Sequence, residues 1–337
     1  MSESRPRVLI AYNEPVLPLD HPDAASEQDV LETVVEVEKV LPDDQFDVAR
    51  LGYARHPREL LHRLETWKPD VVFNLFEGEA DRTETEATNA ALLEWLGVPF
   101  TGSGSVAIAL GRDKVRSKLL FQGAGVPTAP FRVVDSLPAG DWPHLWPAII
   151  KPACQDCSVG IDQGAVVNSP AELEARVAYL FDRLGGPVLV EQYIPGREFH
   201  VHVIEEPGAA EVRVLPVTEI RFELTRDDGY WPVYTYEGKW NEASVEFKRT
   251  PLVTCVDLPE PLCKRVAEVS RAAYRLIGLR DYGRVDLRVT PDDEPYVLEV
   301  NPNPYLNSIA LVDGLKAVGG SFAAFIRGLL HRAASRR

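Results

Sequence analysis

The sequence predicts a mixed α/β protein in which an N-terminal parallel-sheet domain is followed by regions containing antiparallel strands. Three observations lead to this fold class. Strand-like and helix-like segments alternate through the first hundred residues, a β-hairpin pattern lies at residues 283–301, and 337 residues are too many for one ordinary core. Strands that alternate with helices form a parallel sheet covered on both faces. We therefore expect two or three domains in one compact body.

Composition narrows the class of protein further. A hydrophobic content of 45% and a charged content of 26% are typical of a soluble globular protein. The net charge of −15 argues against a nucleic-acid partner, which requires a basic surface. No apolar run is long enough to span a bilayer, and the N-terminus lacks a signal-peptide core. The four cysteines include one close pair, Cys154 and Cys157, which favours a reducing cytoplasm over a disulfide framework or a zinc site.

The first region has the alternation of a parallel sheet. Strands are predicted at residues 7–12, 46–51 and 70–76, helices at 57–67 and 83–96, and a strand-like segment at 98–104. Ser26 and Asp29 read as an N-cap pair before a helix whose apolar face carries Val30, Val34 and Val37. Ligands of such sheets bind at the carboxyl ends of the strands, where Asn13 and Glu77 lie.

The later regions mix short strands with helices. Helices are predicted at residues 112–125, 171–184 and 321–334, with a further helix through Leu262 and Val266, and strands at 148–151, 165–167, 188–192, 198–204 and 212–217. Residues 221–250 form a long segment rich in charge, Tyr and Trp. A long segment of this kind within a compact body is a functional cover or is disordered, and the aromatic content favours a cover.

The hairpin at residues 283–289 and 296–301 is predicted to concentrate acidic side chains. A turn centred between Asp292 and Asp293 sets Asp286 opposite Glu299 and Arg284 opposite Asn301. Like charges directly opposed are destabilising, so we expect the two acids to need a cation. Carboxylate and amide oxygens suit Mg²⁺. The alternative is a solvated sheet face, which is less favoured because the hairpin also carries apolar Val285, Leu287, Val297, Leu298 and Val300.

A second group of residues has the character of a nucleotide site. Lys151 ends an apolar strand, where burial is costly unless an anion meets it, and the small polar loop at 155–160 offers backbone N–H groups. No P-loop motif is present. Glu191, beside free backbone groups at a sheet edge, can pair with an adenine amino group, and Glu198 can accept from ribose hydroxyls. The alternative for both is an exposed glutamate at a strand end.

These residues occur in an order that resembles the ATP-grasp superfamily, specifically the D-alanine–D-alanine ligases. The similarity covers nearly the whole chain. KPACQDCSVG is similar to the family's KPxxxxSSVG loop, YEGKW to its YExKY segment and GREF to its GxEF. The resemblance implies an N-terminal Rossmann-like domain at 1–110, a central ATP-grasp domain at 111–190 and a C-terminal ATP-grasp domain at 191–337.

The resemblance also implies a role for individual residues. The implied ATP ligands are Lys114, Lys151, Cys157, Ser158, Val159 and Gly160 for the phosphates, Glu191, Gln192, Tyr193 and Ile194 for adenine, and Glu198 for ribose. The implied ligands of two Mg²⁺ ions, which Mn²⁺ could replace, are Asp286, Glu299 and Asn301. Lys239 reaches the γ-phosphate, Arg284 stabilises an oxyanion and Glu27 orients a substrate. The implied reaction joins a carboxylate to an amine through an acyl phosphate, in a cytoplasmic enzyme that forms a homodimer.

The departures from the family pattern concern the small-molecule substrates. The family's loop serine is Cys157 here, and its cover tyrosine is Trp240. Glu77 replaces a histidine beside the acceptor, so a cationic or amine-bearing acceptor is expected in place of D-alanine. Tyr305 stands where the family has glycine, and Ala310, followed by Leu311, stands where it has the serine that binds the acceptor carboxylate. Two alternatives are left open. A kinase or phosphotransferase shares every ATP residue, whereas a nucleotide-binding regulatory protein without turnover is disfavoured because it would not need the metal ligands.

Overall fold

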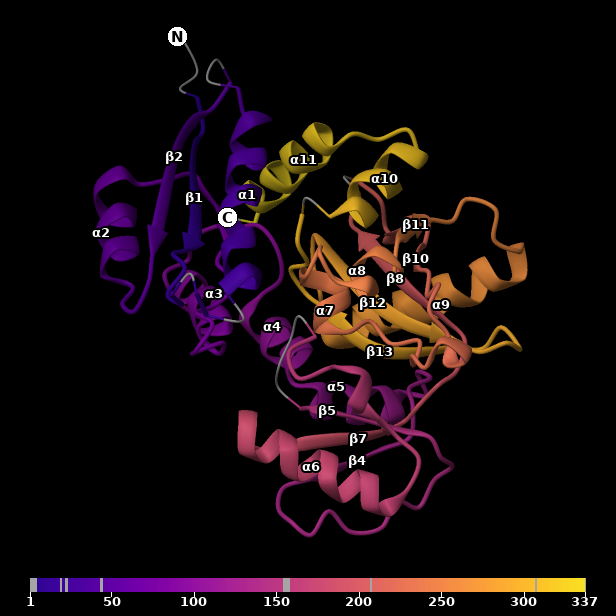
Figure 1. Ribbon diagram of the computed structural model, residues 1–337. Helices are drawn as coiled ribbons and strands as arrows, with labels where there is room; N and C mark the ends of the chain where they lie inside the picture. The colour runs from indigo at the N-terminus through magenta and orange to yellow at the C-terminus, as the bar shows by residue number, and fades with distance from the viewer. Residues whose placement is uncertain are drawn as a thin grey trace.

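Three β-sheets organise the chain, and the candidate site lies between two of them (Figure 1). A computed structural model describes residues 5–18, 20–21, 24–42, 45–153, 158–206, 208–306 and 308–336. The N-terminal sheet lies apart from the two antiparallel sheets in Figure 1, and helix α11 at the end of the chain returns to pack against it. The predicted α/β fold class is confirmed, whereas the boundaries at residues 110 and 190 stay a prediction.

The N-terminal sheet is parallel, as predicted, with the strand order β2-β1-β3. Its elements are β1 (Arg7–Asn13), α1 (Ala24–Lys39), β2 (Asp47–Tyr53), α2 (Arg58–Trp67), β3 (Val71–Leu75) and α3 (Thr85–Trp95). Alternate residues of β1 face opposite layers: Val8 packs in the core cluster that holds α1 and α11, whereas Leu9 packs with α2 and α3. Helices therefore cover both faces, and the apolar face predicted for α1 is buried.

Two local predictions in this region were wrong. Helix α1 begins at Ala24, so Ser26 lies inside the helix and is not its N-cap. Residues 98–104 form no strand of their own; Phe100 makes a single bridge to Val72. The chain turns instead at Gly102 (φ +87°), whose N–H donates to Asp281 in the C-terminal part of the chain. This segment is a turn that joins two parts of the protein, as its glycine and serine content allows.

The second sheet is antiparallel and has the order β4-β7-β5-β6. The region consists of α4 (Ser105–Arg112), α5 (Lys114–Ala124), β4 (Phe131–Val134), β5 (Ala148–Pro152), η1 (Gln163–Ala165), β6 (Val166–Val167), α6 (Pro170–Leu184) and β7 (Val188–Gln192). The helix predicted at 112–125 is thus two helices, because Asp113 leaves the helical conformation and caps α5 through the N–H of Arg116. Strand β4 was not predicted from the sequence.

The third sheet is also antiparallel, with the order β11-β10-β8-β12-β13 and β9 paired to β8. Its strands are β8 (Arg197–Ile204), β9 (Arg213–Val214), β10 (Thr218–Ile220), β11 (Leu252–Thr254), β12 (Tyr282–Val289) and β13 (Pro295–Asn301). Helix α9 (Glu260–Ile277) buries its apolar face against this sheet, and α10 (Ile309–Ala317) and α11 (Phe322–Ala334) follow. The strand predicted at 212–217 shrinks to β9, since residues 215–217 leave the ladder.

The hairpin β12–β13 has the predicted register where it matters for the site. Asp286 pairs with Glu299 and Arg284 with Asn301. A β-bulge follows, because Leu287 pairs with Val297 and leaves Leu298 as an extra residue. The bulge lets the consecutive residues Leu298 and Glu299 both line the same cavity, which a regular strand forbids.

The segment at residues 221–250 is ordered rather than a plain loop. It contains η2 (Arg226–Asp228), α7 (Tyr236–Trp240) and α8 (Val245–Lys248). Across the described residues, no single helix is long and apolar enough to cross a membrane. The pair α10 and α11 meets the length and composition test together, with a bend of 97° between the two helices.

Candidate active site

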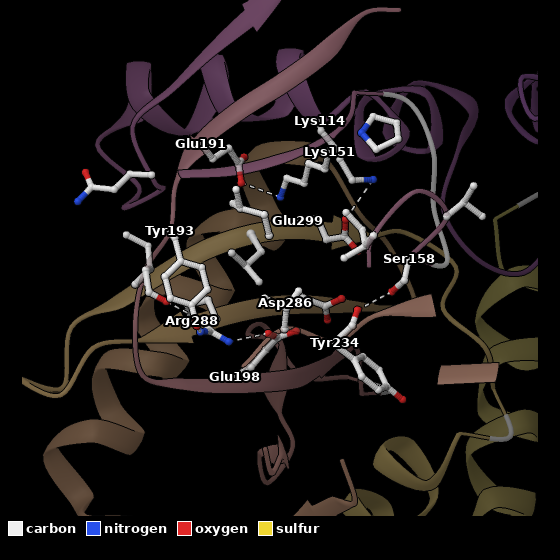
Figure 2. Close-up of a pocket in the computed structure, with 18 residues that line it drawn as sticks. Lys114, Lys151, Ser158, Glu191, Tyr193, Glu198, Tyr234, Asp286, Arg288 and Glu299 are labelled. Atoms are coloured by element: carbon white, nitrogen blue, oxygen red, sulfur yellow. Dashed lines mark hydrogen bonds and ion pairs between the residues drawn. The ribbon is translucent and has the colours of Figure 1, made fainter. Parts of the chain in front are cut away.

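A cleft lies between the two antiparallel sheets (Figure 2). One wall comes from β5 and β7 and the other from β8, β12 and β13. The predicted ATP residues that line the cleft are Lys114, Lys151, Ser158, Val159, Glu191, Gln192, Tyr193, Ile194 and Glu198, together with the predicted metal ligands Asp286 and Glu299. Residues predicted from segments far apart in the sequence therefore gather in one cavity.

Two lysines of the predicted phosphate group form ion pairs with acids that line the cleft. Lys114, at the first turn of α5, places Nζ 3.1 Å from Oε2 of Glu299, and its side chain is 5% exposed. Lys151, on β5, places Nζ 2.6 Å from Oε2 of Glu191. Cationic groups therefore face into the cavity, where an incoming phosphate would compete with these carboxylates for them. Ser158 lies toward the same end as Lys114 in Figure 2.

The loop after β5 contains Gly160, whose backbone is closely surrounded by other residues and which does not line the cleft. Gly160 has φ +75°, and a Cβ there would come within 2.9 Å of Pro152 and 2.8 Å of Leu184. Only glycine fits this left-handed and crowded position. The Gly160 carbonyl accepts a hydrogen bond of 2.8 Å from Arg176 on α6, which fixes the loop to the helix. Cys157, predicted as a phosphate ligand, lies outside the described residues.

The residues predicted for adenine and ribose are held by an arginine that was not predicted from the sequence. Tyr193 and Ile194 follow β7, and Glu198 lies on β8 opposite Arg288 of β12. Arg288 is 3% exposed and contacts all three. Burial raises the pKa of the Glu198 carboxyl, and the charge of Arg288 opposes that shift. The nearby Gly196, at φ +123°, keeps the linker close to β12, since a Cβ would approach the Val289 carbonyl oxygen at 2.1 Å.

A second residue that was not predicted, Lys118, forms an ion pair with Glu191. Lys118 is fully buried, and its Nζ lies 2.7 Å from Oε1 of Glu191 and 2.6 Å from the Thr128 hydroxyl. Burial favours a raised pKa for Glu191, but Lys118 and Lys151 together lower it. Glu191 is thus an anion between two cations, and a phosphate can attract Lys151 while Lys118 stays to neutralise Glu191.

The acids of the hairpin already have protein cations beside them. Arg284 donates from Nε to Asp286 at 2.7 Å and from Nη2 at 2.9 Å. Burial raises the pKa of Asp286, and this ion pair opposes the shift. Burial also disfavours the charge of Glu299, yet Lys114, Lys151 and Arg284 lower its pKa to about 2. Both acids were expected to need a cation, and lysine and arginine side chains of the protein supply positive charge beside them.

The donor set nevertheless fits Mg²⁺. Asp286 and Glu299 are paired across the hairpin, and Asn301 contacts Oδ2 of Asp286 through its amide at 3.1 Å. The two carboxylates and the amide offer hard oxygen donors, which Mg²⁺ prefers. In the described part of the chain, no three Asp, Glu, His or Cys side chains cluster as a metal site by themselves. Asn301 and substrate phosphates would therefore complete the coordination.

The cover segment closes over the loop that follows β5. The Ser158 hydroxyl donates to the Tyr234 carbonyl at 3.0 Å, and the Tyr236 N–H donates to the Ile161 carbonyl at 3.0 Å. Val233 and Tyr234 line the cleft, in agreement with the predicted cover. Lys239, on α7, lies close enough to Asp286 to lower the pKa of its carboxyl, which supports a position near the reacting groups.

Glu27 is anchored by backbone groups. Its Oε2 accepts from the N–H groups of Val16 and Leu17, both at 2.8 Å, and its Oε1 accepts from Ala80 at 3.3 Å. The carboxylate therefore ties together the loops that follow β1 and β3, at the carboxyl ends of the parallel strands. Its predicted role in orienting a substrate stays a prediction.

The residues predicted for the small-molecule substrates lie outside the main cleft. Glu77 follows β3, and its pKa is raised to about 8 by burial and by Glu86 and Asp29, against the charges of Arg112 and Lys239. Tyr305 hydrogen bonds to Asp29. Trp240 lies beside Lys239, whose Nζ is 5.0 Å from the ring centroid. Ala310 and Leu311 are 1% and 0% exposed, so their side chains belong to the core.

The missed residues had signals in the sequence. Lys118 follows Lys114 by four residues, which puts both on one face of a helix. Arg288 follows Asp286 by two residues in a strand, and therefore shares its face. On β8 the same face carries His200, whose Nε2 lies 3.9 Å from Oδ2 of Asp286. The prediction did not extend these periodicities to Lys118 and Arg288.

Comparisons with known proteins agree with this geometry. A family model described as the D-ala D-ala ligase C-terminus matches residues 120–331. D-alanine–D-alanine ligase from Geobacter sulfurreducens is 30% identical over 300 residues, covering 87% of this chain and 85% of that protein. The uncharacterized protein y4sG of Sinorhizobium fredii is 36% identical over 262 residues, covering 77% and 73%.

The fold has a close match among solved structures. D-alanine–D-alanine ligase from Bacillus anthracis complexed with ATP superposes with a TM-score of 0.74 at 20% identity, covering 98% of this chain and 97% of that one. The two facing sheets with lysines and acids between them define an ATP-grasp protein. More particularly, the chain belongs to the D-alanine–D-alanine ligase family, ATP-dependent enzymes that form C–N bonds. The family uses ATP and Mg²⁺.

Proposed function

We propose that this enzyme joins a small carboxylate donor to an amine acceptor through an acyl phosphate, and that the acceptor carries a second amine or another cationic group. The observation that carries the ligase proposal is the single cleft that gathers Lys114, Lys151, Asp286 and Glu299. The acceptor proposal rests on Glu77. The acceptor proposal goes beyond the family assignment, because D-alanine is the substrate named for the relatives and not for this chain.

The proposed reaction has two steps whose atoms balance. A carboxylate oxygen of the donor attacks the γ-phosphorus of ATP, a C–O–P linkage forms, and the bond to ADP breaks. The acceptor nitrogen then attacks the acyl carbon and loses a proton, and phosphate leaves as the C–N bond forms. Lys114, Lys151 and Lys239 would offset the phosphate charge, and Arg284 would stabilise the oxyanion. One such donor contributes about 2.7–4 kcal/mol.

Positioning and the exclusion of water are the remaining tasks of the chain. Asp286, Glu299 and Asn301 would hold two Mg²⁺ ions, or Mn²⁺ in their place, which supply charge neutralisation at the phosphate when bound. The hydrogen bonds between the cover segment and the loop after β5 would keep the cleft closed during the lifetime of the acyl phosphate, which water otherwise hydrolyses.

The acceptor proposal follows from the charge around Glu77. Asp29 and Glu86 lie near enough to raise its pKa. At neutral pH the carboxyl is therefore largely protonated, and an ammonium group that binds beside it would restore the carboxylate and release a proton. A neutral acceptor brings no such compensation. A diamine or a basic amino acid would consequently be bound more tightly than alanine.

The test is a substrate panel with product analysis. ADP release is measured with D- and L-amino acids, diamines and short peptides, and products are identified by mass spectrometry. An amide product supports the ligase, a stable phosphorylated product indicates a kinase or phosphotransferase, and ATP binding without turnover under all conditions indicates a regulatory protein. Equal rates with neutral and diamine acceptors would overturn the acceptor proposal while leaving the ligase proposal intact.

Glu299→Gln tests the metal assignment. Removing this carboxylate should raise the Mg²⁺ concentration for half-maximal ADP release by about tenfold or more, since it deletes one charged oxygen donor. The matched control is Glu294→Gln in the turn of the same hairpin, where the side chain is 58% exposed. An unchanged Mg²⁺ dependence in Glu299→Gln would contradict the assignment.

A further inference from the structure

Arg288 is a buried arginine in the wall of the cleft to which the reaction above gives no role. It lies on the same face of β12 as Arg284 and Asp286, but at the end that carries Tyr193 (Figure 2). Its side chain is 4% exposed. An arginine so far from water has to be balanced by acceptors, and those acceptors show what it holds.

Four N–H groups of the guanidinium donate to different segments. Nε donates to the Ile194 carbonyl at 3.0 Å, and Nη2 donates to the Tyr193 hydroxyl at 2.8 Å. Nη1 donates to Oε2 of Glu198 and to the Pro232 carbonyl, both at 3.0 Å. The Tyr193 hydroxyl in turn donates to the same Pro232 carbonyl at 3.1 Å. One side chain therefore joins the linker after β7, strand β8 and the cover segment.

The contact with Glu198 has a consequence for ligand binding. Arg288 and Glu198 are paired on neighbouring strands, and both line the cleft. Within the described residues, the hydrogen bond and ion pair of the carboxylate involve Oε2, so Oε1 is the oxygen presented to a ligand. A carboxylate that an arginine holds in one orientation is a strong acceptor for hydroxyl groups. Burial alone raises the pKa of Glu198 and favours the neutral form, which Arg288 opposes.

We infer that Arg288 is a positioning residue that holds Glu198 ready for the hydroxyl groups of a ribose, so that preference for a ribonucleotide depends on Arg288. This inference rests on the proposed ATP site. Lysine cannot replace the arginine fully, because an ammonium lacks the planar fork that serves Ile194, Glu198 and Tyr193 together. The role is distinct from that of Arg284, which pairs with Asp286 at the other end of the strand.

The experiment compares the affinities of ATP and 2′,3′-dideoxy-ATP, measured by calorimetry with Mg²⁺ and the full chain. Wild type should prefer ATP by about tenfold or more, which is about 1.4 kcal/mol. Arg288→Met should bring the ratio close to one, as should Glu198→Gln, and the double variant should lose nothing further. A role in folding alone would weaken both nucleotides equally and keep the ratio, which would overturn the inference.

Two further variants serve as a control and as a replacement if Arg288→Met does not fold. Arg197→Met is the matched control on β8, because its guanidinium pairs with Glu219 at 2.8 Å and its side chain is 39% exposed; it should keep the wild-type ratio. If Arg288→Met does not fold, Arg288→Lys replaces it and should lower the ratio at least threefold, whereas a wild-type ratio overturns the inference. Failure of wild type to bind ATP would instead refute the proposed nucleotide site.

Discussion

Replacing Glu77 by glutamine should remove a pH dependence from the stability of the protein. The carboxyl of Glu77 has a pKa raised to about 8 by burial and by the charges of Glu86 and Asp29. In the unfolded chain its pKa returns to the ordinary 4.5. Between these two values the native state holds a proton that the unfolded state has lost. The contribution to stability is therefore fully present below pH 4.5 and is lost as pH rises through 8.

The size of this effect follows from the two pKa values. At about 1.36 kcal/mol for each pH unit, the raised pKa corresponds to at most about 5 kcal/mol. The Glu77 side chain is partly exposed, so solvent screening reduces the expected loss to roughly 2–3 kcal/mol. Glu77→Gln keeps a neutral side chain of the same shape at every pH. The variant should match wild type near pH 5 and exceed its stability by roughly 2–3 kcal/mol near pH 8.5.

The assay is urea unfolding at intervals from pH 5 to 8.5, without substrates, for wild type and Glu77→Gln. Glu65→Gln, on the exposed surface of α2, is the control and should follow wild type at every pH. A difference between Glu77→Gln and wild type that stays constant with pH would refute the reasoning, because it would show that Glu77 is ionised throughout. The amine-acceptor proposal would then lose its electrostatic basis.

Two other substitutions test buried charge. Asp281→Asn should lower the free energy of unfolding, measured in urea, by about 2–4 kcal/mol. The reason is that the fully buried carboxylate accepts hydrogen bonds from Arg336 at 2.7 Å and from Gly102 at 2.8 Å. Asparagine tolerates the backbone φ of +65° at this position, so a loss below about 0.5 kcal/mol would show that the charge is dispensable. Lys118→Met should weaken ATP binding by about tenfold, since Lys151 would then be needed to neutralise Glu191. Unchanged affinity for ATP in a folded variant would contradict this prediction. The control is Lys316→Met, which removes the lysine of an exposed ion pair.

Local patterns in the sequence predicted the elements whose signals are strong and short-ranged. The parallel sheet followed from alternating strands and helices, and the register of Asp286 against Glu299 followed from the spacing about the hairpin turn. Both predictions rest on patterns within short stretches of the chain. The bulge at Leu298 was missed because a bulge depends on how the strand packs, which no turn signal encodes.

The sequence by itself determined the class of protein and the chemical types present in the site: lysines for phosphate, and acids with an amide on one hairpin. Only the tertiary structure decided which charges meet. It paired Lys114 with Glu299 and Lys118 with Glu191. It also buried Ala310 and Leu311 in the core. The physical reason is that the effect of a charge depends on distance and on exclusion of water, and both are set when segments far apart in the sequence pack together.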